Sequence, residues 1–189
     1  MEKRRVVITG MGTVNPVGNS VAESWAAVKA GTCGIGPITR YDASEMKVKL
    51  AGEVKNLDLD ALLGKRETKK MDRFTQLSLA AADECVAGAG LDREKENPDR
   101  CGVIFSSGIG GFETVGQAHQ RGSERGWDTV SPFMIPMIIS NMAAGHMAIR
   151  CGFTGMCSCV VTACAGGTNA VGDAFRHIRD GYAEVMLCG

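Results

Sequence analysis

Residues 157–180 read CSCVVTACAGGTNAVGDAFRHIRD, a short β-branched run that passes through small residues and a cysteine into an amphipathic segment. The run 157–161 predicts a strand, and apolar side chains that recur every three or four positions predict a helix over 165–180. Cys164 falls in the turn between these two elements. The sequence therefore predicts a thiol at the N-terminus of a helix.

The chemistry of such a corner favours a reactive cysteine. Unpaired backbone N–H groups at a helix N-terminus carry partial positive charge, which favours the nucleophilic thiolate over the thiol. Small residues on either side of Cys164 leave room for an acyl carbonyl, and the cysteine's own N–H is a candidate oxyanion donor. Most cysteines in apolar segments only fill space. The other seven cysteines lack a strand-to-helix corner with flanking glycines, so Cys164 is the candidate nucleophile.

The composition narrows the class of protein. The chain has 189 residues, with 21 basic and 21 acidic side chains and a formal net charge of zero. This balance predicts no general attraction to nucleic acid or to a membrane surface. The N-terminal sequence has no apolar signal-peptide region, and no segment approaches the roughly 20 apolar residues of a membrane span. We therefore expect a cytoplasmic protein whose eight cysteines are reduced. Their spacing predicts no zinc site, and no metal or cofactor is expected.

Strand-like and helix-like segments alternate along the chain. Strands are expected near residues 5–9, 47–54, 101–105, 157–161 and 184–188. Helices are expected over about 19–30, 64–88, 137–150 and 165–180, whereas residues 112–136 are expected to be less regular. This alternation predicts an α/β fold, with a mainly parallel five-stranded sheet and helices on both faces.

Other motifs admit two interpretations each. The glycine-rich loop 106–111 follows a strand, as a ligand-binding loop or a moving gate does. The proline-bounded apolar segment 131–136 is either an interface or a pocket wall. The basic run 64–73 is either a solvated helix end, the commoner case, or a docking site for an acidic partner. Gly10 and Gly12 follow a strand as in a dinucleotide-binding turn, but the third glycine and the acidic partner are missing, which disfavours that interpretation.

Several ordered motifs together resemble one family. They are VVITGMG at 6–12 with NPVG at 15–18, GIGG at 108–111, SPF at 131–133, NMAAGH at 141–146, and TAC at 162–164 followed by Gly166. From end to end, the chain resembles the β-ketoacyl-[acyl carrier protein] synthases, and among them the type II elongating enzymes of bacterial fatty acid synthesis.

The resemblance implies a fold and an assembly. The family has the thiolase-like fold, in which two similar α/β halves pack together, and residues 1–189 match the N-terminal half. Two catalytic histidines, a lysine and the second oxyanion donor belong to the C-terminal half, outside this chain. The resemblance therefore implies that residues 1–189 alone do not catalyse condensation. It also implies a homodimer, and acyl carrier protein as a partner.

The resemblance also assigns roles to individual residues. Cys164 matches the acyl-accepting nucleophile, and Ile109, next to Gly108, matches the gate of the acyl pocket. Ala163, Phe133 and Met134 match the pocket wall. Residues matching the basic patch that docks the carrier protein are Lys65, Arg66, Lys69 and Lys70. A second basic pair of some relatives is replaced here by Asp128 and Thr129.

The implied reaction is a decarboxylating Claisen condensation, an acyltransferase reaction that needs no metal or cofactor. Cys164 takes the acyl chain as a thioester, and malonyl carrier protein supplies two carbons to give a 3-oxoacyl product. The alternatives are a polyketide ketosynthase, a degradative thiolase and a non-catalytic chain-length subunit of the same fold. Subunits of the last kind lack the nucleophile, so Cys164 argues against that alternative.

Overall fold

The centre of the molecule is a parallel sheet of three strands in the order β4-β3-β5. The computed structural model describes residues 4–92 and 94–189. Strand β3 (Cys101–Ser106) lies between β4 (Cys157–Val160) and β5 (Val185–Cys188), and both neighbours run parallel to it. Because the three strands run the same way, the loops that leave their carboxyl ends meet at one edge of the sheet.

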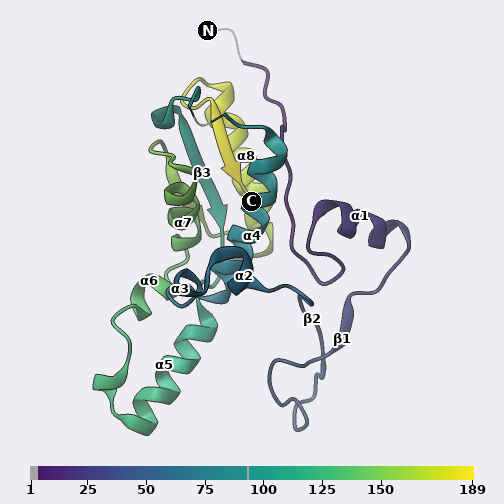
Figure 1. Ribbon diagram of the computed structural model, residues 1–189, viewed down its shortest axis with the longest axis vertical. Coiled ribbons are helices and arrows are strands. Elements are labelled where there is room, and N and C mark those ends of the chain that lie inside the picture. The colour runs from purple at the N-terminus through teal and green to yellow at the C-terminus, as the bar shows by residue number, and fades with distance from the viewer. Residues whose placement is uncertain (1–3, 93) are drawn as a thin grey trace.

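Helices cover both faces of this sheet (Figure 1). On one face, Val103 of β3 and Leu187 of β5 join a core that includes residues of helices α4 (Arg73–Ala89) and α7 (Met142–Cys151). On the other, Ile104 packs against Ala170 and Ala174 of helix α8 (Gly166–Arg179). Successive β3 side chains thus point to opposite faces, as a strand buried on both sides requires.

Capping residues explain where two of the helices begin and where one of them ends. Ser20 precedes helix α1 (Val21–Lys29), and its hydroxyl accepts the Glu23 N–H at 3.2 Å. Asp72 precedes α4 and accepts the Phe74 N–H at 3.1 Å. Helix α4 ends at Gly90, whose φ of 62° is a left-handed conformation that glycine adopts without strain.

The remaining elements extend from the core in two arms (Figure 1). One arm carries α1 and the antiparallel strands β1 (Ile35–Pro37) and β2 (Leu50–Gly52). The other carries helices α5 (Phe112–Arg125) and α6 (Met134–Ile138). Short helices α2 (Leu59–Leu63) and α3 (Lys65–Thr68) precede α4, and three 3₁₀ turns are η1 (Pro98–Arg100), η2 (Trp127–Thr129) and η3 (Ala163–Ala165).

The α/β class is confirmed, but the prediction of five strands in one sheet is wrong. Three of the expected strands, at 101–105, 157–161 and 184–188, form the parallel sheet within the described residues. The expected strand 47–54 is shortened to β2 and pairs only with β1. Residues 5–9 form no strand; Val7 and Ile8 are 61% and 80% exposed.

Close packing explains the path of the chain after residue 9. A Cβ on Gly10 would lie 2.2 Å from the Cys85 carbonyl oxygen, and one on Gly12 would lie 1.9 Å from that of Ala81. Only glycine allows the backbone to approach α4 so closely. This segment therefore lies against a helix, and not beside a strand that would supply ladder hydrogen bonds.

The prediction that residues 112–136 are irregular is also wrong. Helix α5 fills 14 of these positions, and the shorter α6 includes Pro136. Helix α7 begins at Met142, later than the expected start near Pro136, because α6 and the turn after it come between. Gly116 and Gly122 lower the intrinsic helix propensity of α5 by about 1 kcal/mol each relative to alanine. Tertiary contacts, and not intrinsic helix propensity, therefore determine that this segment is helical.

Candidate active site

Cys164 lies at the corner between β4 and α8, at the carboxyl edge of the parallel sheet. Cys164 lies in the single 3₁₀ turn η3, and α8 begins two residues later. The thiol is exposed, and no side chain caps η3 or α8 with a hydrogen bond. In this turn, the Ala165 N–H donates to the Thr162 carbonyl at 3.1 Å and the Gly166 N–H donates to the Ala163 carbonyl. The Cys164 N–H stays the candidate oxyanion donor.

Two neighbours fix the geometry of this corner. Ala163 has a φ of 49°, the left-handed region that residues other than glycine rarely adopt. Gly166 packs so tightly on the end of β3 that a Cβ there would lie 1.8 Å from the Ser106 Oγ and 2.8 Å from the Ser106 Cβ. The backbone on both sides of Cys164 is thus constrained, which gives the thiol a defined position.

The strain at Ala163 gives a prediction for stability. Ala163→Val should lower the free energy of unfolding by roughly 1–3 kcal/mol, because a β-branched side chain at a positive φ is strongly disfavoured. Ala163→Gly should stay within about 1 kcal/mol of the parent protein, since relieved strain and added chain entropy oppose each other. Ala165→Val is the matched control, because Ala165 is also exposed but has an ordinary φ of −84°.

Urea unfolding of the three variants checks this prediction. Equal losses for the two valine variants would show that the backbone at position 163 carries no special strain.

The predicted gate follows β3 at the same edge of the sheet. Gly108 and Ile109 are exposed, with Ile109 at 72%. The loop then turns back on the end of α6, where the Gly111 N–H donates to the Ile138 carbonyl at 3.0 Å. The structure thus brings the predicted gate loop against the helix whose first turn carries Met134.

The five residues predicted for the substrate pocket lie at loop and helix starts. Phe133 is 54% exposed and directly precedes α6, whereas Met134 is half-buried. Ala163 is exposed, like Gly108 and Ile109. Two hollows in the described residues, of about 220 and 410 Å³, lie elsewhere, beside Asp72 and beside Val86. The pocket assignment therefore stays a prediction.

The predicted carrier-docking residues lie together on α3 and the turn that follows it. Lys65, Arg66 and Lys69 are exposed. Lys70 is half-buried and pairs with Glu67 at 3.0 Å, which lowers the pKa of that carboxyl. Within the described residues, no salt bridge is formed by Lys65, Arg66 or Lys69. Three such surface cations suit an acidic partner, but the same arrangement also fits a solvated helix end.

Other cysteines contrast with Cys164. Burial raises the pKa of the Cys85, Cys101 and Cys188 thiols, which keeps them protonated. The pKa of Cys157 is raised by burial and by the neighbouring Cys159. Cys85, Cys101 and Cys188 therefore have the character of packing residues, whereas Cys157 is exposed.

The three histidines are placed on other elements. His119 contacts Trp127 on the arm of α5. The pKa of His146 on α7 is lowered, mainly by burial. His177 lies near the end of α8, roughly 20 Å along the helix axis from Cys164 at about 1.5 Å per residue. These positions give no reason to assign a histidine of this chain to the thiol.

Metal and membrane functions gain no support from the described residues. In the ranges 4–92 and 94–189, no three or more His, Cys, Asp or Glu side chains are grouped to hold a metal ion. Nor does any helix in the part of the chain that the structure describes have the length and apolar character to cross a membrane.

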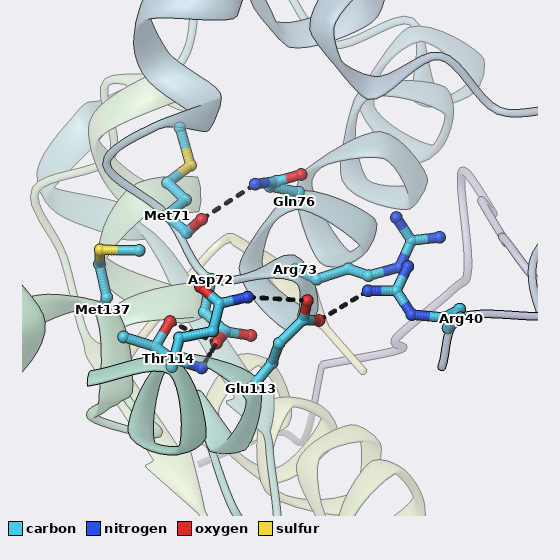
Figure 2. Close-up of a pocket in the computed structure, with 9 residues that line it drawn as sticks. Arg40, Met71, Asp72, Arg73, Gln76, Glu113, Thr114 and Met137 are labelled. Carbon is cyan, nitrogen blue, oxygen red and sulfur yellow. Dashed lines mark hydrogen bonds and ion pairs between the residues drawn. The ribbon is translucent and has the colours of Figure 1, made fainter. Parts of the chain in front are cut away.

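Asp72 is a residue that sequence reasoning missed. It is only 5% exposed, and its carboxylate accepts a hydrogen bond from Phe74 in the first turn of α4. It also accepts hydrogen bonds from Thr114 in the first turn of α5 (Figure 2). The sequence signal was an aspartate placed directly before a helix, which predicts a cap for that helix. Nothing in the sequence pattern connects it to Thr114, which lies 42 positions further along the chain.

The class of protein follows from a family model. The β-ketoacyl synthase N-terminal domain matches residues 3–189, nearly the whole chain. The chain therefore belongs to the β-ketoacyl synthase family, and its fold is the N-terminal half of the thiolase-like fold.

Particular relatives narrow the comparison. The chain is 44% identical over 189 residues to 3-oxoacyl-[acyl-carrier-protein] synthase 2 of Synechocystis sp. (strain ATCC 27184 / PCC 6803 / Kazusa). It is 45% identical over 188 residues to the protein of the same name from Staphylococcus aureus (strain COL). Each match covers 100% of this chain and 45% of the relative, so the chain spans less than half the length of these proteins.

Solved structures support the same fold. The ishigamide ketosynthase/chain length factor superposes with a TM-score of 0.89 at 27% identity, covering 99% of this chain and 47% of that one. A type II polyketide ketosynthase in complex with its acyl carrier protein, AntDE:AntF, gives a TM-score of 0.83 at 26% identity, covering 100% and 51%. A β-ketoacyl synthase from Burkholderia phymatum STM815 gives 0.82 at 27% identity, covering 100% and 46%.

Proposed function

We propose that residues 1–189 form the nucleophile-bearing half of a condensing enzyme of fatty acid synthesis, a 3-oxoacyl-[acyl carrier protein] synthase. The Cys164 thiolate attacks the acyl carbonyl of an acyl carrier thioester, the new carbon–sulfur bond forms, and the carrier thiol leaves. Malonyl carrier protein then loses carbon dioxide, and the resulting enolate carbon attacks the Cys164 thioester. A carbon–carbon bond forms, the cysteine thiolate leaves, and the product is a 3-oxoacyl carrier protein.

The single observation that carries this proposal is the place of Cys164. An exposed thiol stands at the start of a 14-residue helix, at the carboxyl edge of a parallel sheet, between a strained alanine and a buried glycine. In this proposal, the Cys164 N–H faces the carbonyl oxygen that the sulfur attacks and stabilises the negative charge that develops on it. Identity of 44–45% to proteins named as such synthases supports the same reaction.

In this proposal, the acid–base partners of Cys164 do not belong to residues 1–189. Decarboxylation needs donors that stabilise the enolate, and the histidines of this chain lie on α5, on α7 and near the end of α8. We propose that a C-terminal half supplies them, so that residues 1–189 alone do not catalyse turnover. Its packing would also cover apolar side chains that are now exposed, such as Ile149 and Val161.

We further propose a cytoplasmic homodimer. The segment 131–136 presents Ile135 and the predicted pocket-wall residue Phe133, which are 57% and 54% exposed. Exposed apolar side chains of this size are typical of a subunit interface. Light scattering at micromolar concentration should give the mass of a dimer, and a monomer would contradict this part of the proposal.

A polyketide ketosynthase is the second candidate, because one structural neighbour is a type II polyketide ketosynthase and another is a ketosynthase/chain length factor. The two candidates differ in product. A fatty acid synthase component condenses once per reduced acyl chain, whereas a polyketide ketosynthase extends an unreduced 3-oxoacyl chain. Supplying the purified enzyme with a 3-oxoacyl carrier protein and malonyl carrier protein separates them, since only the second candidate gives a longer polyketone.

Mass spectrometry of the purified protein tests the main proposal. Incubation with hexanoyl carrier protein should add one hexanoyl group to the peptide that contains Cys164. The assembled enzyme is residues 1–189 together with the proposed C-terminal half. Addition of malonyl carrier protein to this enzyme should remove the hexanoyl group and release a 3-oxoacyl carrier protein. A stable protein with no adduct would favour the non-catalytic subunit, and an adduct that only acetyl thioesters remove would favour a degradative thiolase.

The basic patch gives a prediction for carrier binding. Lys65→Glu combined with Lys69→Glu should weaken the binding of acyl carrier protein about tenfold at low salt, chiefly by slowing association. The loss should shrink at high salt, because ions screen exposed charges. Lys95→Glu is the control, since Lys95 is an exposed lysine in a different loop, where it pairs with Asp92 at 2.7 Å.

Surface plasmon resonance at two salt concentrations measures this effect. The same loss in the control variant, or a loss that salt does not change, would contradict docking at this patch.

A further inference from the structure

The buried carboxylate of Asp72 joins three segments that the proposed function treats separately. The carrier-docking segment 65–70 ends two residues before Asp72, the gate loop 107–111 lies against its side chain, and α6 closes the other side of that loop. Figure 2 shows two of the hydrogen bonds that define these contacts, from Gln76 to Met71 and from Thr114 to Asp72.

The first contact fixes Asp72 to the docking segment. Met71 and Asp72 are both buried, so the chain cannot move freely between α3 and α4. The Gln76 side-chain amide donates to the Thr68 carbonyl at 3.0 Å and to the Met71 carbonyl at 2.9 Å. The turn that carries Lys69 and Lys70 is therefore held to the first turn of α4. A displacement of this turn would also displace Asp72.

The second contact fixes Asp72 to α5. Its Oδ2 accepts the Thr114 N–H at 2.9 Å and the Thr114 Oγ–H at 2.6 Å, while its Oδ1 accepts the Phe74 N–H at 3.1 Å. Gly111 precedes α5 and provides no side-chain cap. One carboxylate from α4 thus caps two helices, and hydrogen bonds to a charged acceptor are stronger than neutral ones.

The third contact fixes the gate loop itself. A Cβ on Gly111 would lie 3.0 Å from the Asp72 Oδ2 and 2.4 Å from the Met137 carbonyl oxygen, so this residue is packed between the carboxylate and α6. Gly110 has a φ of 75°, and a Cβ there would lie 2.2 Å from the Ile138 carbonyl oxygen. Ile109, the predicted gate, directly precedes this packed pair and is 72% exposed.

From these contacts we propose that Asp72 is a positioning residue that couples carrier docking to the acyl gate and so helps to set chain-length preference. The proposal rests on the proposed function. We call the hydrogen bonds between Asp72 and Thr114 the 72–114 junction. A displacement of α3 on docking moves Asp72, the junction moves the start of α5, and the loop that holds Ile109 moves with it.

Space beside the junction permits such a movement. A hollow of about 220 Å³ adjoins it, lined in part by Met71, Gln117 and Met137. Side chains along one flank of α5 therefore lack the dense packing that would hold the helix rigidly to α4. The Arg40–Glu113 ion pair at 2.7 Å spans the open side, where both side chains are exposed enough to rearrange.

Thr114→Val in the assembled enzyme tests the coupling, because valine keeps the shape of threonine and removes the Oγ–H donor. We expect the ratio of kcat/KM for hexadecanoyl to hexanoyl carrier protein to change about tenfold, with the affinity for unacylated carrier protein within about twofold of the parent. Thr114→Ser restores the donor and should restore the ratio. Thr39→Val is the matched control, because Thr39 also donates its N–H and Oγ–H to one carboxylate, that of Glu53.

Hydrogen exchange gives a readout that a merely structural role would not move. Carrier protein should change the exchange of the amides of residues 107–112 in the parent and in Thr39→Val, and this response should disappear in Thr114→Val. Asp72→Asn, which has a single acceptor oxygen in place of two, should behave like Thr114→Val.

The outcomes separate the two proposals. An unchanged chain-length ratio together with an unchanged exchange response refutes the coupling, even if the thermal midpoint falls. No acylation of Cys164 in the parent enzyme refutes the proposed function, and the coupling with it.

Discussion

Replacing Cys164 by alanine should lower the kcat/KM for condensation by at least about 10³-fold, because covalent capture of the acyl chain loses its nucleophile. The fold should hardly change. The thiol is exposed, and substitutions at exposed positions alter the free energy of unfolding by about 0.5 kcal/mol or less. The kcat/KM of Cys164→Ser should lie between that of the parent enzyme and that of Cys164→Ala, since a hydroxyl ionises much less readily than a thiol at the same helix start.

Cys33→Ala is the matched control for this experiment. Cys33 is also an exposed free thiol, but it lies in the loop before β1, away from the carboxyl edge of the parallel sheet. Steady-state formation of the 3-oxoacyl product by the purified enzyme, together with the mass of the acylated peptide, measures the effect. More than about a tenth of the parent activity in Cys164→Ala would place the nucleophile elsewhere.

The strand–turn–helix corner around Cys164 was predictable from the sequence because its determinants are local. A β-branched run, two small residues and an amphipathic segment specify strand, turn and helix within about 25 residues of one another. The structure forms β4, η3 and α8 at these positions. The role of Cys164 needed one further step, since the field of a helix N-terminus acts on whichever side chain the turn places there.

The N-terminal strand failed as a prediction because a strand needs a partner. Residues 5–9 have the β-branched composition of a buried strand, yet composition does not state what lies beside them. In the structure, Arg4 donates its N–H to the Arg179 carbonyl at 3.3 Å, and the glycines that follow pack on α4. Pairing is a non-local property, and nothing in the local pattern fixes it.

Helix α5 and the 72–114 junction were not predicted, for a related reason. Phe112 is 72% exposed, and two glycines weaken the helix signal, so burial and propensity give little support to α5. What supports it is the Asp72 carboxylate at its start and the Trp127 ring on Gly122 near its end. Both partners lie outside the helix. Candidate residues for docking, gate and pocket came from family resemblance, which does not reveal the contact that joins them.

The tight contact behind the nucleophile predicts the second large effect. Gly166→Ala should lower the free energy of unfolding by about 1–3 kcal/mol, the usual cost of overpacking, although alanine has the better helix propensity. Rotation of the Ser106 hydroxyl relieves the contact at 1.8 Å, but the new methyl group still lies 2.8 Å from the Ser106 Cβ. The start of α8 must therefore move away from β3, and Cys164 moves with it. Because small displacements of a reacting group are costly, kcat should fall by up to about 10²-fold.

A double-mutant series identifies the cause of the Gly166→Ala effect. Ser106→Ala removes only the hydroxyl, whereas Ser106→Gly also removes the Cβ, so stability and kcat should recover partly in the first double variant and further in the second. Gly167→Ala is the matched control, since a Cβ there meets only the Gly189 carbonyl carbon at 3.8 Å, an ordinary contact in the same turn. Denaturant unfolding and acylation rates measure the series. If Gly167→Ala were as damaging as Gly166→Ala, or if neither serine substitution helped, the contact between β3 and α8 would not be what positions the thiol.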